Sequence, residues 1–208
     1  MLRILIADDH EIVRQAIKQI LLDEFSFAHI EEAGNTEAVI NKAINDEWNI
    51  VICDVAMPGG GGMKALQTIM EKKPALPVLF FSAYPEEQYA LRLVKAGAAG
   101  YLNKDSATEE LVNAIRKVLS GKKYITPSVA EKLGLAIEPT DAALHELLSE
   151  RELSIFFLLA AGESISEIAA RLELAATTVS TYRSRILTKM KMKTNAELTV
   201  YAVENKLI

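Results

Sequence analysis

Five charged or hydroxyl side chains stand in this sequence at or just after the ends of short apolar runs. They are Asp8 and Asp9, after residues 2–7; Asp54, after residues 50–53; Ser82, at the end of residues 78–82; and Lys104, after residues 99–102. Such runs are typical of parallel strands buried on both faces. Because the carboxyl ends of parallel strands share one edge of a sheet, we expect these side chains to lie together.

Together these five groups could make an aspartyl phosphate. Three carboxylates would repel one another unless a cation joined the Lys104 ammonium. Carboxylate, carbonyl and water oxygens suit Mg²⁺. Two acids for the metal, a third as nucleophile, and a lysine and a hydroxyl for phosphoryl oxygens complete the set. The alternative is that these residues only cap their strands; one or two would be ordinary, but all five in this order favour the chemistry.

Alternating strands and helices would position these residues. The expected strands are 2–7, 29–32, 50–53, 78–82 and 99–102, and the expected helices are 11–22, 35–45, 63–72, 86–96 and 108–120, with a glycine loop at 59–62. The first helix has its apolar residues at helical spacing: Ile12, Val13, Ala16, Ile17, Ile20 and Leu21. Five alternations predict an α/β fold, a doubly wound parallel sheet with helices on both faces.

Residues 1–121 resemble a CheY-like receiver domain in the segments ILIADDH, ICDVAMP, LFFSA and GAAGYLNKD. The resemblance implies a five-stranded flavodoxin-like sheet with Asp54 as phosphate acceptor. It also implies that Asp9, Asp54 and the Ala56 carbonyl hold Mg²⁺, with Asp8 acting through water. These residue roles are expectations of the resemblance.

The same resemblance assigns the remaining polar strand ends. Ser82 would follow the phosphoryl group, Lys104 would pair with it, and the Tyr101 rotamer would report the movement. Two features depart from other receivers. Asp105 stands where many have a proline, and the loop after Pro58 has four glycines in succession, residues 59–62.

The second half of the chain reads as a small all-α domain. Residues 122–143 contain Pro127, Gly134 and Pro139, and we expect a linker with a short helix at residues 128–135. An extra helix of the first domain is the alternative. In residues 144–208, capping boxes begin at Ser149, Ser164 and Thr194. Four helices follow, at about 150–161, 165–172, 177–190 and 195–204, and the second and third read as a helix-turn-helix.

The helix expected at 177–190 has one polar face without any acid. Val179, Tyr182, Ile186 and Met190 share the face that should be core. The residues we expect to contact DNA are Thr177, Thr178, Ser180, Thr181, Ser184, Arg185, Thr188 and Lys191. Short hydroxyl side chains fit a major groove, whereas Arg and Lys suit phosphates. The plain alternative is a solvent-facing polar helix.

Residues 147–208 resemble a LuxR-type DNA-binding domain in LSERE, ISEIAARLEL, TTVSTYRSRIL and NAELTVYAVENKLI. The whole chain is therefore similar to NarL/FixJ-type response regulators. This resemblance implies a transcription regulator rather than an enzyme, with double-stranded DNA, a sensor histidine kinase and a second copy of the chain as partners. The chain departs from the family at Glu173, where a turn glycine is common, and at Ala175, where a hydroxyl cap is common.

Composition sets the remaining expectations. The 208 residues carry a net charge of −5, yet no Asp or Glu lies between Glu173 and Glu197. One cysteine, Cys53, fits a reducing cytosol, and the absence of a long apolar run argues against a membrane span, so we expect a cytoplasmic protein. A haloacid-dehalogenase-type phosphatase is a competing interpretation, but Ala56 stands where its second acid is expected. A module regulated by protein contact alone is another, and the intact acids argue against it.

Overall fold

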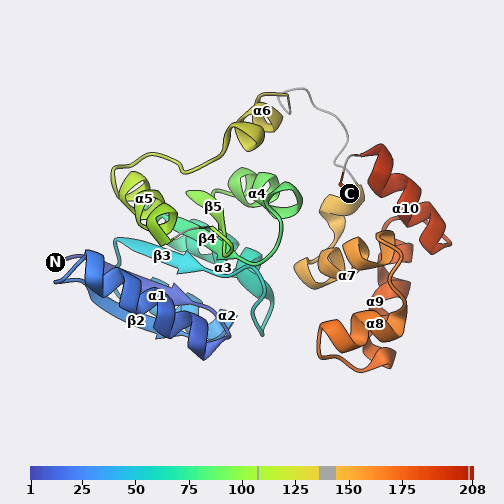
Figure 1. Cartoon of the computed structure of the whole chain (residues 1–208), viewed down its shortest axis with the longest axis horizontal. Coiled ribbons are helices and arrows are strands. Elements are labelled where there is room, and N and C mark those ends of the chain that lie inside the picture. The colour runs from blue at the N-terminus through green and yellow to red at the C-terminus, as the bar shows by residue number, and fades with distance from the viewer. Residues whose placement is uncertain (107, 136–143, 206) are drawn as a thin grey trace. The chain divides into compact units, whose positions relative to one another are not determined.

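The computed structural model describes residues 1–106, 108–135, 144–205 and 207–208. By its internal contacts the chain divides into two compact units, Met1–Ile137 and Glu138–Ile208. Each unit is described by itself, and Figure 1 labels the elements of both. No helix within the described residues is long and apolar enough to cross a membrane.

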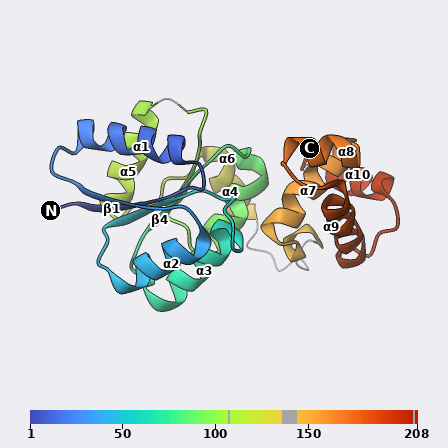
Figure 2. The ribbon, with the colours of Figure 1, turned by 90° about the horizontal axis from the view of Figure 1, so that it is seen from below.

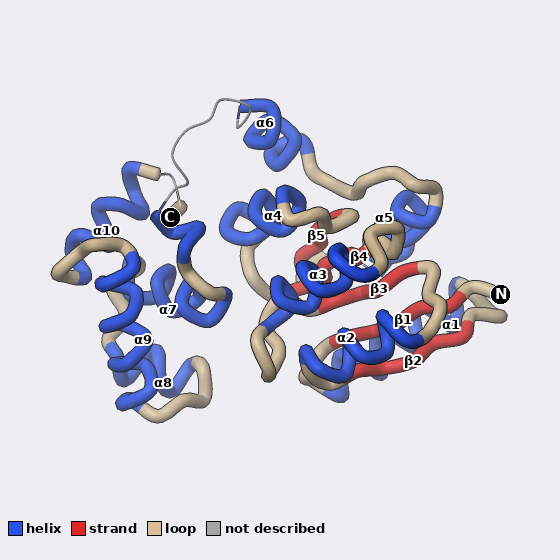
Figure 3. Tube along the Cα trace, turned by 180° about the vertical axis from the view of Figure 1, so that it is seen from behind, coloured by secondary structure: helices blue, strands red, loops and turns tan. Residues whose placement is uncertain are grey.

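The first unit is the predicted α/β fold. Its strands are β1 (Arg3–Ala7), β2 (His29–Ala33), β3 (Ile50–Cys53), β4 (Val78–Ser82) and β5 (Gly100–Asn103). Its first five helices are α1 (Glu11–Glu24), α2 (Thr36–Asn45), α3 (Gly61–Lys72), α4 (Glu86–Lys95) and α5 (Thr108–Leu119). The strands pair in parallel in the order β2-β1-β3-β4-β5, as the sheet in Figure 3 shows.

Helices cover both faces of the sheet, which explains why its central strands are apolar throughout. Every residue of β3 and β4 is buried. Figure 2 shows α1 and α5 over one face and α2 and α3 over the other, while α4 packs beside β5. Between the sheet and the α1/α5 layer lies a core that includes Ile4, Ile52, Phe81, Leu21 and Ile115.

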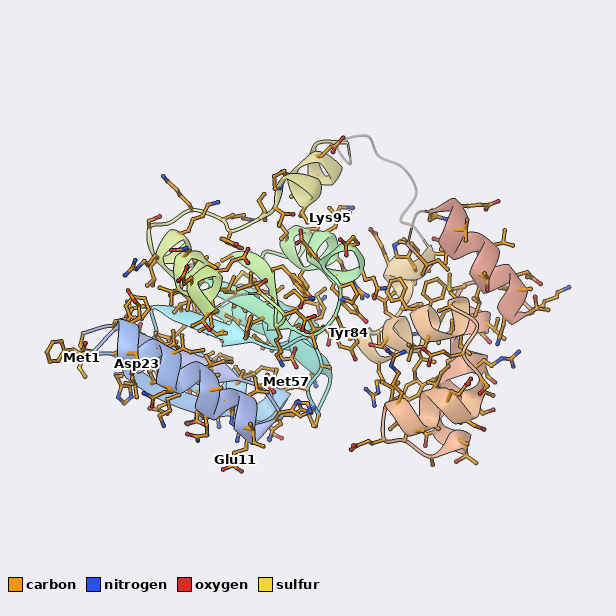
Figure 4. All side chains as sticks on the ribbon, viewed as in Figure 1. Met1, Glu11, Asp23, Met57, Tyr84 and Lys95 are labelled. Atoms are coloured by element: carbon orange, nitrogen blue, oxygen red, sulfur yellow. The ribbon has the colours of Figure 1, made fainter. Side chains whose placement is uncertain are left out.

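The prediction for α1 was partly wrong. Ile17 and Leu21 are buried as expected, but Ile12 is 85% exposed and Ala16 is also exposed. Figure 4 places Glu11 at the carboxyl end of the sheet, opposite Met1. The first turn of α1 therefore lies at the edge, where little strand surface remains to cover it.

The chain after α5 returns to the first unit. Tyr124 donates its backbone N–H to Ala99 O at 2.8 Å and accepts from Tyr101 N at 3.3 Å, which extends the sheet beyond β5. Helix α6 (Pro127–Leu135) then packs against α4, with Val129 buried. Helix α6 therefore packs as an extra helix of the first domain, which was the alternative to a linker helix. The rest of the predicted linker, residues 136–143, lies outside the described residues, and the domain boundaries stay a prediction.

The second unit is a helical bundle. It comprises the 3₁₀ turn η1 (Leu144–Leu147) and the helices α7 (Glu150–Ala160), α8 (Ile165–Arg171), α9 (Ala176–Lys189) and α10 (Asn195–Glu204). Capping boxes open α7 and α8 at Ser149 and Ser164, and the Thr194 hydroxyl caps α10. Helices α8 and α9 pack together across a short turn and form the predicted helix-turn-helix.

The glycine loop is not entirely a loop, because α3 already begins at Gly61. Gly59, Gly60 and Gly61 have φ angles of 96°, 125° and 78°, a region that side chains disfavour. Gly62 is required for a different reason. A Cβ there would lie 2.4 Å from Asp54 O and 2.6 Å from the Phe80 ring, so the start of α3 can sit against β3 only without a side chain.

We expect Gly62→Ala to destabilise the first unit by roughly 1–3 kcal/mol, the range for overpacking a filled site. The matched control is Gly34→Ala, whose added Cβ would meet only Arg14 Nη1, at 3.6 Å. The control should change stability by less than about 0.5 kcal/mol. Urea unfolding of the two variants measures the difference, and equal losses would contradict the packing argument.

Candidate functional site

The backbone ties the carboxyl ends of the strands together. Asp54 N donates to Ala7 O at 2.8 Å, and Lys104 N donates to Ser82 O at 2.8 Å. Figure 4 shows Met57 and Tyr84, from loops that follow β3 and β4, at this end of the sheet. Side chains from β1, β3, β4 and β5 therefore meet at one place, as predicted.

Lys104 bridges two buried carboxylates. Its Nζ lies 2.5 Å from Asp8 Oδ2 and 3.1 Å from Asp54 Oδ2. The side chains of Asp8, Asp54 and Lys104 are 2%, 6% and 15% exposed. Two carboxylates thus share one ammonium, and the buried group as a whole keeps an excess of negative charge.

Burial and charge shift the pKa values of these groups. Burial raises the pKa of the Asp54 carboxyl and Asp8 adds to the rise, although the Lys104 ammonium opposes both. Burial alone would lower the pKa of Lys104, but the charges and hydrogen bonds of Asp54 and Asp8 raise it overall. Lys104 is therefore held in its charged form.

The same edge offers the donor set of a cation site. One ligand atom from each of Asp8, Asp9, His10 and Asp54 lies within 4.8 Å of the others. The Ser82 hydroxyl is buried beside Asp54 and has no hydrogen-bond partner among the described residues. Carboxylate oxygens around an excess negative charge fit a hard divalent ion.

Tyr101 is buried inside the first unit, and its hydroxyl donates to Tyr84 O at 2.6 Å. Asn103 Nδ2 donates to the same carbonyl at 3.1 Å, and Asn103 Oδ1 accepts from Asp105 N at 2.7 Å. Burial raises the pKa of the Tyr101 phenol, which remains a donor. The loop between β4 and α4 is thus held by two donors from β5.

Sequence reasoning missed three residues here. His10 is one of three scattered histidines without metal-ligand spacing in the sequence, yet its ring joins the acidic cluster. Asn103 and Tyr84 were not considered, although Asn103 lies two positions after Tyr101 on one strand, a spacing that puts both side chains on the same face. No cis peptide occurs among the described residues, including after Lys104.

The outward face of α9 is exposed, as expected for a binding surface. The exposed candidates are Thr177, Ser180, Thr181, Ser184, Arg185, Thr188 and Lys191, whereas Thr178 is partly buried. Its inner face differs from the prediction in one position. Leu187 is buried with Val179, Ile186 and Met190, while Tyr182 is only partly buried, with the Arg185 guanidinium 5.9 Å from its ring centre.

Three hydroxyls on α9 bond back to its own turns. Thr181 and Thr188 donate to the carbonyls of Thr177 and Ser184, each at 2.9 Å, and Ser184 donates to Ser180 O at 3.2 Å. Because these protons are used within the helix, the hydroxyl oxygens face outward as acceptors.

Tertiary contacts hold α9 where local caps are missing. Ala175 makes no side-chain cap, and Glu173 in the preceding turn has a φ of 52°, consistent with the turn glycine it replaces. Lys189 Nζ donates to the buried carboxylate of Glu152 at 2.6 Å, and Arg183 Nε donates to Asn195 Oδ1 at 2.7 Å. The second contact ties α9 to the start of α10.

Two family models match the two units. A model of the response regulator receiver domain matches residues 4–116, and a model of the luxR family of bacterial regulatory proteins matches residues 146–202. The chain belongs to the LuxR-type response regulators. This is a family of transcription regulators, so the interpretation as a phosphatase is wrong.

Two curated response regulators match along the whole chain, and one solved structure matches part of it. Response regulator GacA of Pseudomonas viridiflava is 34% identical and UvrY of Escherichia coli K12 is 35% identical, over 100% of this chain and 98% and 96% of those proteins. A solved LuxR-family response regulator from Aurantimonas sp. SI85-9A1 is 30% identical over 64% of this chain and 96% of its own, with a TM-score of 0.58.

Structures of more distant response regulators share the fold. RcsB of Salmonella enterica serovar Typhimurium, bound to promoter rprA in the presence of phosphomimetic BeF3⁻, is 22% identical with a TM-score of 0.59. The similarity covers 97% of this chain and 98% of that chain.

In this response regulator, Asp54→Asn should raise stability when no divalent ion is present. The folded state holds the Asp54 proton more tightly than the unfolded chain, so ionising the carboxyl costs free energy above its raised pKa and nothing well below the ordinary value of 3.8. The variant should gain roughly 1 kcal/mol at pH values above the raised pKa, and less as the pH falls through that pKa toward 3.8. Lys104 keeps Asp8 as a partner.

Urea unfolding midpoints measured over a series of pH values from just above 3.8 to 8 follow this gain. Asp105→Asn is the control because Asp105 is exposed and its side chain has no described contact with the cluster. A variant at position 54 that is less stable than the wild type throughout this pH range would show that the ion pair with Lys104 outweighs the burial of Asp54.

Proposed function

We propose that Asp54 accepts a phosphoryl group from a sensor histidine kinase and that phosphorylation controls binding of double-stranded DNA by α9. The observation that carries the first half is the buried Asp54 carboxylate, which has Lys104 at 3.1 Å and an unpaired Ser82 hydroxyl beside it. Family membership supports the same reading. Asp54 is a nucleophile with two phosphate-binding groups already beside it.

The cation in this proposal is Mg²⁺, held by Asp9, Asp54 and the Ala56 carbonyl, with Asp8 acting through water. When bound, Mg²⁺ would neutralise charge on the carboxylates and on the transferring phosphoryl group. The grouping of their carboxylate oxygens within 4.8 Å supports Asp8, Asp9 and Asp54. The assignment of the Ala56 carbonyl as a Mg²⁺ ligand rests on the family resemblance alone.

In the transfer step, a carboxylate oxygen of Asp54 attacks the phosphorus atom. The bond from phosphorus to the donor nitrogen breaks, and the departing imidazole keeps the electron pair and takes up a proton. Lys104, anchored on Asp8 at 2.5 Å, pairs with a phosphoryl oxygen, and the Ser82 hydroxyl donates to another. Positioning and charge neutralisation do most of the work in such transfers.

The phosphoryl group then reaches α4 through a short chain of contacts. Ser82 lies two residues before Tyr84, whose carbonyl is held by Tyr101 and Asn103. A Ser82 hydroxyl drawn toward the phosphoryl group strains this loop, and Tyr101 can respond by changing rotamer. Helix α4, which starts at Glu86, is the element that moves.

Labelling with radioactive acetyl phosphate and Mg²⁺ tests the acceptor. Asp54→Asn should abolish the label and keep the fold, because an amide is not a nucleophile toward phosphorus. Asp105→Asn should label like the wild type, since Asp105 is exposed and its side chain makes no described contact with the cluster. Retained Mg²⁺-dependent labelling of the Asp54 variant would overturn the assignment.

For DNA, we propose that α9 lies in the major groove and that the chain binds as a homodimer. Thr177, Thr181 and Ser184 would face base edges, with Thr178 and Ser180 at the margin. Arg185, Thr188 and Lys191 would meet phosphates. We further propose a cytoplasmic protein with a receiver at 1–121, a linker at 122–143 whose first part, including α6, packs on the receiver, and the DNA-binding domain at 144–208.

Substitutions on α9 should separate base reading from phosphate binding. Thr181→Ala and Ser184→Ala should each cost about 1–3 kcal/mol on the preferred operator and relax preference at particular bases. Lys191→Ala should weaken all sequences alike and lower the salt slope by about one. Binding over mutated operators at several salt concentrations measures both. Uniform losses for Thr181→Ala would contradict direct readout.

A further inference from the structure

The imidazole of His10 stands at the exposed side of the acidic cluster. Its Nδ1 lies 2.8 Å from Asp9 Oδ1 and 3.2 Å from Asp8 Oδ1. The backbone N–H of His10 donates to Asp8 Oδ1 at 2.8 Å, which fixes the position from which the side chain starts. Because the side chain is 69% exposed, its ring can turn Nδ1 toward an ion without disturbing the core.

The spacing of the four candidate ligands suits one ion. The ligand atoms of Asp8, Asp9, His10 and Asp54 lie within 4.8 Å of one another. Ligands on opposite sides of an ion are separated by about twice the bond length, roughly 4.2 Å for bonds of about 2.1 Å. Small inward shifts therefore bring all four atoms onto a single centre.

A second feature marks this place as a ligand site independently of the carboxylates. The Ser82 hydroxyl is 1% exposed and lies beside Asp54, and it has no hydrogen-bond partner among the described residues. A buried hydroxyl without a partner costs free energy. Because it makes no hydrogen bond of good geometry with the carboxylate beside it, this hydroxyl is free to bond to a group that is not part of the chain.

We propose that His10 Nδ1 is a further ligand of the cation bound at the cluster of Asp8, Asp9 and Asp54, and that it raises the affinity of this site for Mn²⁺, Co²⁺ and Ni²⁺ relative to Mg²⁺. The inference rests on the proposed function, because it concerns the same site. Imidazole suits first-row transition metals, whereas Mg²⁺ takes oxygen ligands. On ligation the neutral imidazole gives the Nδ1 lone pair to the metal and carries its one proton on Nε2, so a proton on Nδ1 in the metal-free chain passes to solvent and an unprotonated Nε2 takes one up from solvent.

Calorimetric titration of the unphosphorylated full chain with Mg²⁺, Co²⁺ and Ni²⁺ tests this directly. The measured quantity is the ratio of the Mg²⁺ and Co²⁺ dissociation constants. His10→Asn should lower that ratio by about 10-fold or more, since even partners of metal ligands change affinity 10–100-fold. His29→Asn is the matched control. His29 also pairs with a carboxylate, Glu31 at 3.0 Å, but it begins β2 and so lies at the opposite end of the sheet.

A spectroscopic readout needs no variant. Pulsed electron paramagnetic resonance of Mn²⁺ bound to the wild type should show coupling to one imidazole nitrogen. The coupling should persist in His29→Asn and vanish in His10→Asn. No nitrogen coupling in the wild type, or an equal selectivity ratio in the wild type and His10→Asn, overturns the role of His10, because the ring then only hydrogen-bonds to Asp9.

The failure of this inference differs from the failure of the proposed function. If the wild type binds Mg²⁺ and labels Asp54, but cation choice does not depend on His10, only the inference falls. If the wild type binds none of these ions and Asp54 takes no label, the phosphoacceptor function falls and the inference falls with it.

Discussion

The interaction on which the first unit depends is the Lys104 ammonium held between Asp8 and Asp54. Two carboxylates this deeply buried cannot both be ionised without a compensating charge, and one lysine compensates only one of them. The remaining negative charge favours the binding of a cation. It also leaves the Lys104 ammonium able to pair with an anionic group that enters the site. The strand ends hold these charged side chains close together, because backbone hydrogen bonds join Asp54 N to Ala7 O and Lys104 N to Ser82 O. The sheet thus fixes the position of one carboxylate charge that Lys104 does not neutralise.

The contacts around the strand ends also determine which elements a conformational change at the site can reach. Tyr84 O accepts from both Tyr101 and Asn103, so the loop between Ser82 and α4 is held on β5 rather than by its own turn. Helix α6 packs against α4, and the chain just before it pairs with β5 through Tyr124. This loop, α4 and the segment that leads out of the first unit are therefore joined by a continuous set of contacts. Two packed arrangements of one loop, rather than a gradual deformation, are the form of coupling expected in a close-packed core.

Much of this could be predicted from the sequence, because apolar runs and strand-end polar residues are local signals. The strands, the helices and the meeting of Asp8, Asp54, Ser82 and Lys104 follow from the alternation of elements. The predictions of burial were wrong where burial depends on residues that are distant in the sequence but close in space. Ile12 has the right spacing for the core but lies where no strand covers it, and Leu187 displaces Tyr182 inside the bundle. The roles of His10 and Asn103 depend on groups brought near by loops whose conformation no periodic pattern encodes.

In the second unit, the stability of α9 likewise depends on tertiary contacts more than on local sequence signals. Ala175 gives α9 no side-chain cap, and the residues on its outer face are hydroxyls that favour caps and turns over helix interiors. Local propensity alone would leave this helix weak. Its position comes from the buried Val179 and Ile186, from Lys189 on the buried Glu152 and from Arg183 on Asn195. Because stability is supplied from the inner side, the outer face is free to carry short side chains, and the hydroxyls of Thr181, Ser184 and Thr188 bond back to the helix. The free lone pairs of these three hydroxyls therefore face solvent, beside the exposed guanidinium of Arg185.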